Sequence, residues 1–230
     1  MDAAGLHLIF DADDTLWDAN VLFERAINDF IEWMAHPTVD HAAIRATLHD
    51  IEAANSVTHG YGTRVFLRSL HDCFEHLLER EPTPEDREQI EALAAPLLAH
   101  AIEPIAGVEA TLQTLAARHD LMLLTKGDET EQQTKIDASG FAGHFRRIFI
   151  VPEKTTDVYV DLVAAEVLDP EHTWMIGNSP KSDIAPALAA GLGAVFIPNV
   201  NTWALEHAPL DEDAERLLQL ERFSDLLAHF

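Results

Sequence analysis

The feature that most constrains this chain is an acidic stretch near its start, FDADDTLWD, which covers residues 10–18. It follows a short apolar run, and such a run ending in acids is typical of a buried parallel strand that stops at a functional edge. If the chain stays extended, Asp11 and Asp13 point to the same side of the strand. Two carboxylates held together cost free energy unless a cation or a shared proton compensates them. The stretch therefore predicts acid chemistry or metal binding at this edge, and a plain acidic turn is the simpler alternative.

Composition restricts the class of protein. The chain has 230 residues, of which 47% are apolar and 24% charged, as in ordinary globular proteins. It has no run of eighteen apolar residues and no basic segment followed by an apolar one at its start, so we expect neither a membrane span nor a signal peptide. The single cysteine, Cys73, excludes an intrachain disulfide. Together these features predict a cytoplasmic protein.

The charge balance restricts the partners. Fifteen Lys and Arg residues stand against 40 Asp and Glu residues, which gives a formal net charge of −25. Such a surface repels nucleic acid polymers and anionic lipid, so neither is expected as a partner. A small anionic substrate would have to be held by local groups of opposite charge.

Residues 18–102 contain no convincing strand and predict a small all-helical unit. Apolar residues recur at helical spacing, and prolines and glycines interrupt the pattern. The expected helices cover residues 20–36, 40–55, 63–81 and 85–100, with a kink at Pro96 in the last. The segment SVTHGYG, residues 56–62, is expected to be a loop.

From residue 103 onward, strands alternate with helices. The expected strands cover residues 121–125, 147–151, 173–177 and 194–198, and the expected helices cover residues 107–119, 129–139, 155–167, 183–190 and 215–229. This alternation predicts a parallel α/β sheet wound right-handed. We therefore expect a core formed by residues 1–17 and 103–230, interrupted by a helical insertion at residues 18–102. The insertion leaves the carboxyl end of the first strand, where open sheets bind ligands, so it is placed to act as a lid.

Polar residues follow most of the expected strands. Thr125 and Lys126 follow one strand, Lys154 comes soon after the next, and Asn178 and Asp183 follow the third. Each residue alone has a plain explanation as a turn residue, a solvated charge or a helix cap. At one edge of one sheet, however, they supply a hydroxyl and an ammonium for an anion, beside acids suited to a nucleophile and a metal.

These motifs, in this order, resemble those of the haloacid dehalogenase superfamily, specifically its phosphatase-type members with a helical cap inserted after the first strand. DADDT matches the family's DxDx[TV] motif, and LMLLT matches its apolar strand ending in Thr or Ser. Lys154 matches the third motif, with Thr155 in place of the usual Pro. In GNSPKSD, Asn178 replaces the first acid of the fourth motif and Asp183 keeps the second.

The resemblance implies a Rossmann-like three-layer α/β core with a parallel sheet, an all-helical cap, and phosphoryl transfer through an aspartyl-phosphate. Asp11 would be the nucleophile, and Asp13 would protonate the leaving oxygen and then deprotonate water. Thr125, Lys126 and Lys154 would hold the phosphate oxygens. Mg²⁺ would be held by Asp11, the backbone carbonyl of Asp13, Asp183 and, through a water, Asn178.

The resemblance also suggests a small phosphorylated metabolite as substrate, either a sugar phosphate or a nucleoside monophosphate, and a monomer or homodimer. Within the expected cap, the segment HGYGTR at residues 59–64 places Arg64 where it could pair with a second anionic group, or simply face solvent. Three alternative functions remain open: dehalogenase chemistry on carbon, a phosphomutase on the same core, and a non-catalytic binding or regulatory protein, which only Asn178 favours.

Overall fold

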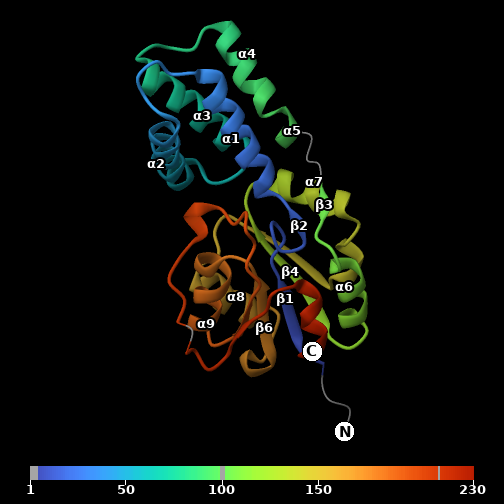
Figure 1. The fold of residues 1–230 in the computed structure, drawn as a ribbon. Helices are drawn as coiled ribbons and strands as arrows, with labels where there is room; N and C mark the ends of the chain where they lie inside the picture. The colour runs from blue at the N-terminus through green and yellow to red at the C-terminus, as the bar shows by residue number, and fades with distance from the viewer. Residues whose placement is uncertain (1–4, 99–101, 212) are drawn as a thin grey trace. The chain divides into compact units, whose positions relative to one another are not determined.

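The computed structural model describes residues 5–98, 102–211 and 213–230. The chain divides into two compact units, which we call the core unit and the helical unit (Figure 1). The core unit is Met1–Asn20 with Ile102–Phe230, and the helical unit is Val21–Ala101. In the described part of the chain, no helix has both the length and the apolar character that crossing a membrane requires.

The core unit contains a six-stranded sheet in the order β5-β4-β1-β6-β7-β8, and every neighbouring pair is parallel. Its strands are β1 (His7–Phe10), β4 (Asp120–Lys126), β5 (Arg147–Val151), β6 (Thr173–Gly177), β7 (Gly193–Phe196) and β8 (Leu217–Gln219). β1 lies at the centre, where Leu8 pairs with Leu121 on one side and with Trp174 on the other. The predicted parallel α/β class is confirmed, and the carboxyl ends of the strands share one edge.

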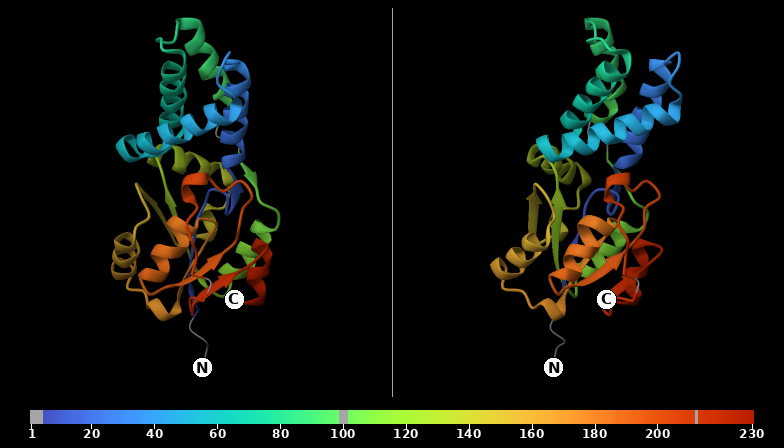
Figure 2. Two further views of the ribbon diagram at one scale, coloured as in Figure 1. Left: turned by 60° about the vertical axis from the view of Figure 1, so that its left-hand side comes forward. Right: turned by 90° about the vertical axis from the view of Figure 1, so that its left-hand side faces the viewer.

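Helices cover both faces of this sheet, which gives three layers (Figure 2). The helices are α6 (Val108–Ala116), α7 (Glu129–Ser139), α8 (Thr156–Ala165) and α9 (Ala185–Ala189), with short helices η1 (Ala142–His144), η2 (Pro170–His172), η3 (Pro180–Ile184), η4 (Ala204–Glu206) and η5 (Phe223–Ala228). Alternate residues of β1 enter different cores, because side chains alternate along a strand. Leu8 and Phe10 pack with α6, α7 and η5, whereas Ile9 packs with α8 and α9.

A two-stranded antiparallel ribbon, absent from the sequence-based expectation, joins β2 (Trp17–Asp18) to β3 (Glu103–Pro104). Trp17 pairs with Pro104, and Asp18 pairs with Glu103. The ribbon lies within the core unit, just before the chain leaves for the helical unit and just after it returns. Runs of two residues are too short to show strand periodicity in a sequence.

The helical unit contains α1 (Asn20–Met34, whose first residue belongs to the core unit), α2 (His41–His59), α3 (Thr63–Leu78), α4 (Pro84–Leu93) and α5 (Ala95–Leu98). Its interior is apolar, with Phe30, Ile44 and Leu70 wholly buried. α2 continues to His59, so the loop predicted at residues 56–62 begins later than expected. Gly60 ends α2 and Gly62 precedes α3. Their φ values are 80° and 123°, which glycine adopts without strain.

One expectation near the end of the chain was wrong, and the start of another helix differs from the one expected. The helix expected at residues 215–229 is replaced by β8 and the short helix η5, so the strand at β7 is not the last. Apolar residues at helical spacing misled this prediction, although Leu218 pairs with Val195 as a sixth strand. The helix expected at residues 183–190 is preceded by a wider helical turn at Pro180–Ile184, so α9 begins at Ala185.

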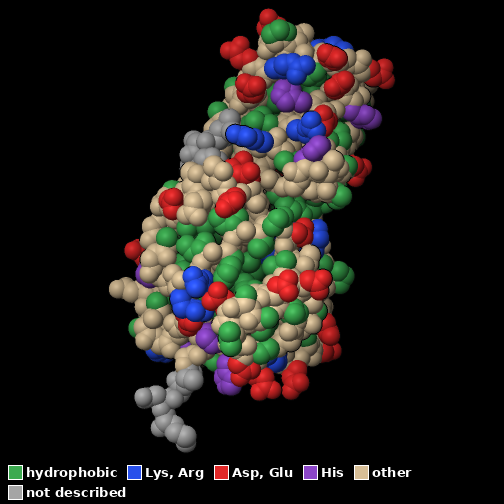
Figure 3. Space-filling model, turned by 180° about the vertical axis from the view of Figure 1, so that it is seen from behind, with side chains coloured by type: hydrophobic (Ala, Val, Ile, Leu, Met, Phe, Trp, Pro, Cys, Tyr) green, Lys and Arg blue, Asp and Glu red, His purple; other side chains and the backbone are tan. Residues whose placement is uncertain are grey.

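The surface is strongly acidic, as the net charge of −25 requires. On the face drawn in Figure 3, Asp and Glu side chains are spread over the surface, and Lys and Arg are fewer.

Candidate active site

The first motif leaves β1 through a tight turn that buries its acids. Asp11 continues the strand, because its N–H donates to the Ile176 carbonyl at 2.9 Å. Asp14 then takes a positive φ of 60°, a conformation that aspartate tolerates better than most residues. Its Oδ1 accepts from the N–H groups of Ala19 and Asn20 at 2.9 and 3.0 Å. The third acid of the motif therefore folds the backbone, and it leaves Asp11 buried at the sheet edge with 7% of its surface exposed.

Lys154 joins the first and fourth motifs. Its Nζ donates to Asp11 Oδ1 at 2.5 Å and to Asp183 Oδ1 at 2.7 Å, and only 4% of the residue is exposed. Burial lowers the pKa of Lys154, but the charges of Asp11 and Asp183 outweigh it and raise that pKa above its ordinary value. The ammonium is therefore charged, and it offsets the two buried carboxylates that it bridges.

Asp183 is wholly buried, and both of its oxygens have partners. Its Oδ2 accepts from the Ser179 N–H at 2.9 Å, in addition to the Lys154 contact on Oδ1. Burial, followed by the charge of Asp11, raises the pKa of Asp183. The carboxylate packs directly against Gly177, where a Cβ would lie 2.2 Å from Asp183 Oδ2. The glycine that ends β6 is therefore needed to make room for this acid.

Asn178 faces the same oxygens as the first motif. The inward atom of its amide lies 3.3 Å from Asp11 Oδ2, 3.3 Å from the Asp13 carbonyl oxygen and 3.1 Å from Thr15 Oγ1. The outward atom lies 2.8 Å from Thr202 Oγ1, a hydroxyl that can donate or accept. With its nitrogen inward the amide is satisfied at both ends, because the nitrogen donates to these oxygens and the outward oxygen accepts from Thr202. With its oxygen inward, the amide oxygen would face the Asp11 and Asp13 oxygens, an arrangement that needs a cation between them.

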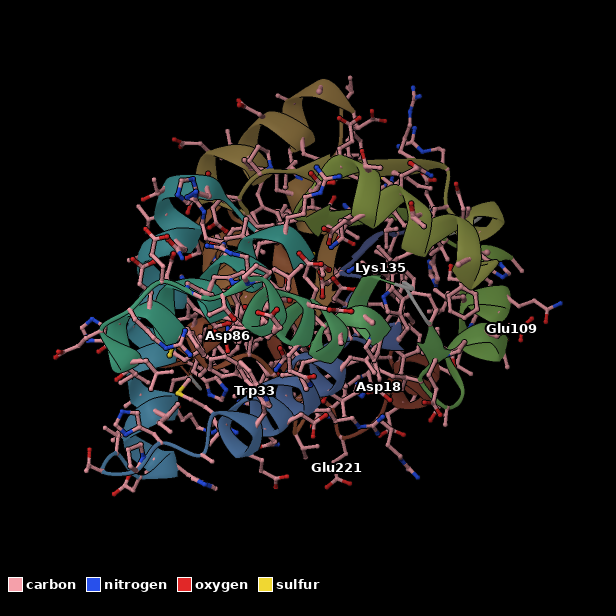
Figure 4. The ribbon with its side chains drawn as sticks, turned by 90° about the horizontal axis from the view of Figure 1, so that it is seen from above. Asp18, Trp33, Asp86, Glu109, Lys135 and Glu221 are labelled. Carbon is pink, nitrogen blue, oxygen red and sulfur yellow. The ribbon has the colours of Figure 1, made fainter. Side chains whose placement is uncertain are left out.

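The Asp13 carboxylate is held by donors of its own. Trp17 Nε1 donates to Oδ1 at 2.7 Å, and Gln132 Nε2 donates to Oδ2 at 2.9 Å. Lys135, which Figure 4 marks on α7, also contacts Oδ2 with its ammonium. Burial raises the pKa of Asp13, but the charge of Lys135 and the three hydrogen bonds outweigh it and lower that pKa. Asp11 and Asp13 are thus two residues apart but have different partners.

Thr125 and Lys126 end β4 at the same edge, but their surroundings differ. Thr125 is 1% exposed and lies beside Ile150 of β5. Lys126 Nζ donates to Ser182 Oγ at 2.9 Å, Glu206 Oε1 at 2.5 Å and Glu153 Oε1 at 3.3 Å. An ammonium has three N–H donors, and these three acceptors use them all. We therefore do not retain the predicted role of Lys126 as a phosphate ligand.

Sequence reasoning did not identify four residues that support this edge, namely Gln132, Lys135, Thr202 and Glu206. They come from α7 and from the segment after β7, outside the four motifs. Gln132 and Lys135 are three apart on one helix, a spacing that places them on one face. That spacing was a usable signal, but Thr202 and Glu206 lie in irregular structure, where no periodicity indicates which way a side chain points.

Arg64 belongs to the helical unit, at the start of α3, where it is exposed. Its predicted pairing with an anionic part of a substrate stays a prediction.

The donor set fits a small hard cation. In the described residues, no three His, Cys, Asp or Glu side chains form a metal-binding group, so such a site needs main-chain and amide oxygens. Those are present: Asp11 Oδ2 and the Asp13 carbonyl each lie 3.3 Å from the inward Asn178 atom. Neighbouring oxygens of an octahedral Mg²⁺, with bonds of about 2.0–2.1 Å, lie roughly 3 Å apart. Asp183, whose oxygens are both occupied, fits the set less directly.

Similarity to known proteins identifies the family of this chain. Residues 7–191 match the family model of haloacid dehalogenase-like hydrolases. The pyrimidine 5′-nucleotidase YjjG from Escherichia coli (strain K12) is 24% identical over 202 residues, which cover 83% of this chain and 84% of that protein. A haloacid dehalogenase-like family hydrolase from Xanthomonas campestris has 30% identity and a TM-score of 0.85, over 98% of this chain and 94% of that one.

Less similar structures share the fold. The HAD-hydrolase YfnB from Bacillus subtilis, described as putative and bound to magnesium, has 21% identity and a TM-score of 0.64, over 99% of this chain and 98% of that one. A 2-haloacid dehalogenase from Pseudomonas syringae pv. tomato DC3000 has 18% identity and a TM-score of 0.62, over 97% of each chain. At these identities the likeness concerns the fold alone. The family model, which spans most of the chain, shows that this protein belongs to the haloacid dehalogenase-like hydrolases.

Proposed function

We propose that this hydrolase is a Mg²⁺-dependent phosphatase that cleaves a small phosphate monoester through an aspartyl-phosphate at Asp11. The observation that carries the proposal is the Lys154 bridge. A buried ammonium 2.5 Å from Asp11 Oδ1 lies beside the nucleophile and supplies positive charge where an incoming phosphate needs it. Asp13, two residues on, is the second acid that phosphate transfer to water requires.

In the proposed reaction, a carboxylate oxygen of Asp11 attacks phosphorus as the bond to the leaving oxygen breaks. Asp13 enters this step in its protonated form, which its lowered pKa makes the minor form near neutral pH, and gives that proton to the leaving oxygen as the alcohol departs. Asp13 then takes a proton from water as the water oxygen attacks phosphorus, and the bond to Asp11 breaks to release inorganic phosphate. Thr125 and Lys154 hold the phosphate oxygens during both steps. Asp11, the Asp13 carbonyl, Asn178 and Asp183 would hold Mg²⁺, which when bound would neutralise charge on the phosphate.

The first experiment measures p-nitrophenyl phosphate hydrolysis with Mg²⁺, after EDTA, and after Mg²⁺ is restored. We expect turnover that EDTA abolishes and Mg²⁺ recovers. Asp11→Asn should abolish turnover while the thermal midpoint is retained, and Asp161→Asn, an exposed aspartate on α8, is the matched control. Intact-mass spectrometry of quenched reactions should show a phosphorylated chain, with the modification mapped to Asp11. Full activity after exhaustive EDTA treatment would contradict the metal requirement.

Asn178 should weaken the metal site relative to an acid. An amide carries no charge, so the site attracts a cation less than a site with aspartate there. We expect Asn178→Asp to bind Mg²⁺ more tightly when titrated in a calorimeter, and Thr202→Val, which removes the outward partner of the amide, to change the affinity as well. Unchanged affinity in both variants would remove Asn178 from the proposed metal site.

A second candidate is hydrolytic dehalogenation, which one observation favours. With its nitrogen inward, Asn178 donates to Asp11 Oδ2 and to the Asp13 carbonyl, and this donor stands where the metal would be. Asp11 would then attack carbon and release a halide. Halide release from 2-chloropropionate that is insensitive to EDTA, without hydrolysis of p-nitrophenyl phosphate, would establish this candidate and overturn the first.

The substrate class follows from two considerations. The surface charge of −25 disfavours large polyanions, which limits the substrate to a small phosphorylated metabolite that local groups can hold. The similarity to a pyrimidine 5′-nucleotidase favours nucleoside monophosphates over sugar phosphates. A panel of both classes, compared by kcat/KM, tests this order. The lone cysteine, Cys73, is buried, in keeping with a protein that acts in the cytoplasm.

A further inference from the structure

Glu206 lies outside all four motifs, yet its carboxylate accepts hydrogen bonds from three side chains at this edge of the sheet. It is 7% exposed and belongs to η4, in the irregular segment between β7 and β8. Its Oε1 accepts from Lys126 at 2.5 Å, and its Oε2 accepts from Ser179 and Ser182 at 2.6 and 2.5 Å. We call these four residues, together with Glu153, the Glu206 network.

The hydrogen bonds of the network close on themselves. Ser182 Oγ accepts from Lys126 and donates to Glu206, while Ser179 Oγ accepts from the Ser182 N–H at 2.9 Å and also donates to Glu206. Each donor therefore meets an acceptor, and the buried charges of Lys126 and Glu206 neutralise each other. A buried polar network that is fully satisfied makes its surroundings rigid, whereas one with a missing member is costly.

The network joins four strand ends. Lys126 is the last residue of β4, Glu153 follows β5, Ser179 and Ser182 follow β6, and Glu206 follows β7. These segments are separate in the sequence, and they meet where Lys126 contacts Glu206, Ser182 and Glu153. Removing the carboxylate would leave the Lys126 ammonium buried without its main counter-charge.

Each end of the network is covalently next to a residue of the proposed site. Lys126 follows Thr125 directly, and Ser182 precedes Asp183. Ser179 also holds Asp183 through its N–H, at 2.9 Å from Oδ2, and Tyr159 donates to the Ser182 carbonyl at 2.9 Å. Asp183 in turn holds Lys154. A movement of Glu206 would therefore displace both Thr125, which is proposed to hold phosphate, and Asp183, which holds Lys154.

We infer that Glu206 is a positioning residue for phosphoryl transfer, which fixes Thr125 and Asp183 by locking their strand ends together through Lys126, Ser179 and Ser182. This inference rests on the proposed phosphatase function. Glu206 contacts no reacting group itself. It acts through its neighbours, so its loss should lower the rate of the chemical step more than it weakens substrate binding.

The test compares Glu206→Gln with wild-type protein on p-nitrophenyl phosphate. The glutamine keeps the shape but places a neutral amide against Lys126. We expect kcat to fall roughly ten- to a hundredfold, the range for loss of a charged hydrogen bond, with KM nearly unchanged. Glu221→Gln is the matched control, because Glu221 is exposed and its side chain points outward in Figure 4. An unchanged kcat, even with a lowered thermal midpoint, would overturn the inference.

A double-variant cycle tests the path through Lys126. Lys126→Met alone leaves Glu206 buried and unpaired, whereas Lys126→Met with Glu206→Gln leaves no unpaired charge. We expect the double variant to lose less activity than the two single losses multiplied together. If the two losses simply multiply, the two residues are not coupled, and the inference that Glu206 acts through Lys126 is wrong.

A measurement independent of turnover separates this inference from the proposed function. In Glu206→Gln, hydrogen exchange should speed up in the peptides that carry residues 122–127 and 178–184, and should stay unchanged in α6. If wild-type protein hydrolyses no phosphate ester, the proposed function fails and the exchange result alone decides whether Glu206 locks these strand ends. Unchanged exchange in both peptides would overturn the lock.

Discussion

The sheet edge of the core unit and the interior of the helical unit bury different kinds of side chain. Among the described residues, the buried Asp, Glu and Lys side chains all belong to the core unit, namely Asp11, Asp14, Lys154, Asp183 and Glu206. The buried polar residues of the helical unit are Thr63 and Ser69, both small and uncharged. Burying charge costs free energy unless each group is paired, so its concentration at one edge indicates a region shaped by chemistry. The helical unit is held together by apolar contact.

The strongest test of this contrast removes the central charge of the edge. Lys154→Met leaves Asp11 and Asp183 facing each other without a cation, and an uncompensated buried charge costs about 3–5 kcal/mol. We expect loss of turnover together with a large fall in the free energy of unfolding, measured by urea denaturation. Lys181→Met, which removes an exposed lysine of η3, should change neither quantity. A stable, active Lys154→Met protein would show that the buried charges are not interdependent.

Asp13→Ala separates chemistry from stability at the same edge. General acid–base help is worth roughly 10² to 10⁴ in rate, and an alkyl phosphate needs leaving-group protonation more than p-nitrophenyl phosphate does. We expect kcat to fall far more on the alkyl ester, when both substrates are measured in parallel. Equal losses on both substrates would count against Asp13 as the acid.

The matching test in the helical unit removes apolar volume. Leu70 of α3 is wholly buried, and Leu→Ala changes in cores cost about 2–5 kcal/mol. We expect Leu70→Ala to lower the midpoint of thermal unfolding. At room temperature, kcat on p-nitrophenyl phosphate should stay at the wild-type value. A fall in kcat as large as that of Asp13→Ala would break the division between a chemical edge and an apolar interior.

Asp14 offers a test by pH. Burial raises its pKa from 3.8 to about 7, despite the N–H groups of Ala19 and Asn20 that favour the ionised form. A raised carboxyl pKa contributes stability that is complete below the unfolded value and is lost as pH rises through about 7. Asp14→Asn stays neutral and tolerates the positive φ, so it should match wild type at acid pH and exceed it above neutrality, by at most about 4 kcal/mol.

Thermal unfolding of both proteins between acid and mildly alkaline pH measures this difference. Asp161→Asn, whose aspartate is exposed, should follow the wild-type curve throughout. A constant offset between Asp14→Asn and wild type at every pH would show that titration of Asp14 does not set the stability of the turn.

The smallest expected effect concerns the exposed Arg64 of the helical unit. If its guanidinium binds a remote anionic group, Arg64→Ala should lower kcat/KM on the natural substrate by about tenfold and spare p-nitrophenyl phosphate, which lacks that group. The comparison uses the best nucleoside monophosphate of the substrate panel, with Arg87→Ala as the control for loss of a cation from the same unit. Equal kinetics on both substrates would leave Arg64 as a surface residue.

The sequence was most informative where a side chain's direction follows from a regular period. The bounds of β5, β6 and α7 agree with those expected: β5 and β6 are short apolar runs, and Gly140 ends α7. The edge that gathers Asp11, Lys154 and Asp183 was likewise expected, since the ends of parallel strands converge. The third acid of the first motif was named, but its backbone role depends on a positive φ that the sequence does not show.

The parts of the site and fold that the sequence did not predict depend on contacts between segments far apart in the chain. Lys126 was assigned to phosphate because it follows Thr125, and only the folded chain reveals the acids that engage it. Thr202 and Glu206 reach the edge from a segment without period, so the sequence carries no signal of their direction. Similarly, local apolar spacing predicts a helix where the structure has β8. Pairing with β7, rather than local preference, decides the conformation of these residues.

The ribbon of β2 and β3 has a consequence for how this family can diversify. It holds the points of departure and return of the inserted chain at the spacing of paired strands, about 4.8 Å, and neither strand belongs to the six-stranded sheet. An inserted module needs only neighbouring ends to be accommodated there. Exchanging residues 21–101 for another module with adjoining termini would thus leave the order of the sheet and the register of β1 intact. The ribbon is thus the place in the fold where one inserted segment can be exchanged for another without altering the sheet.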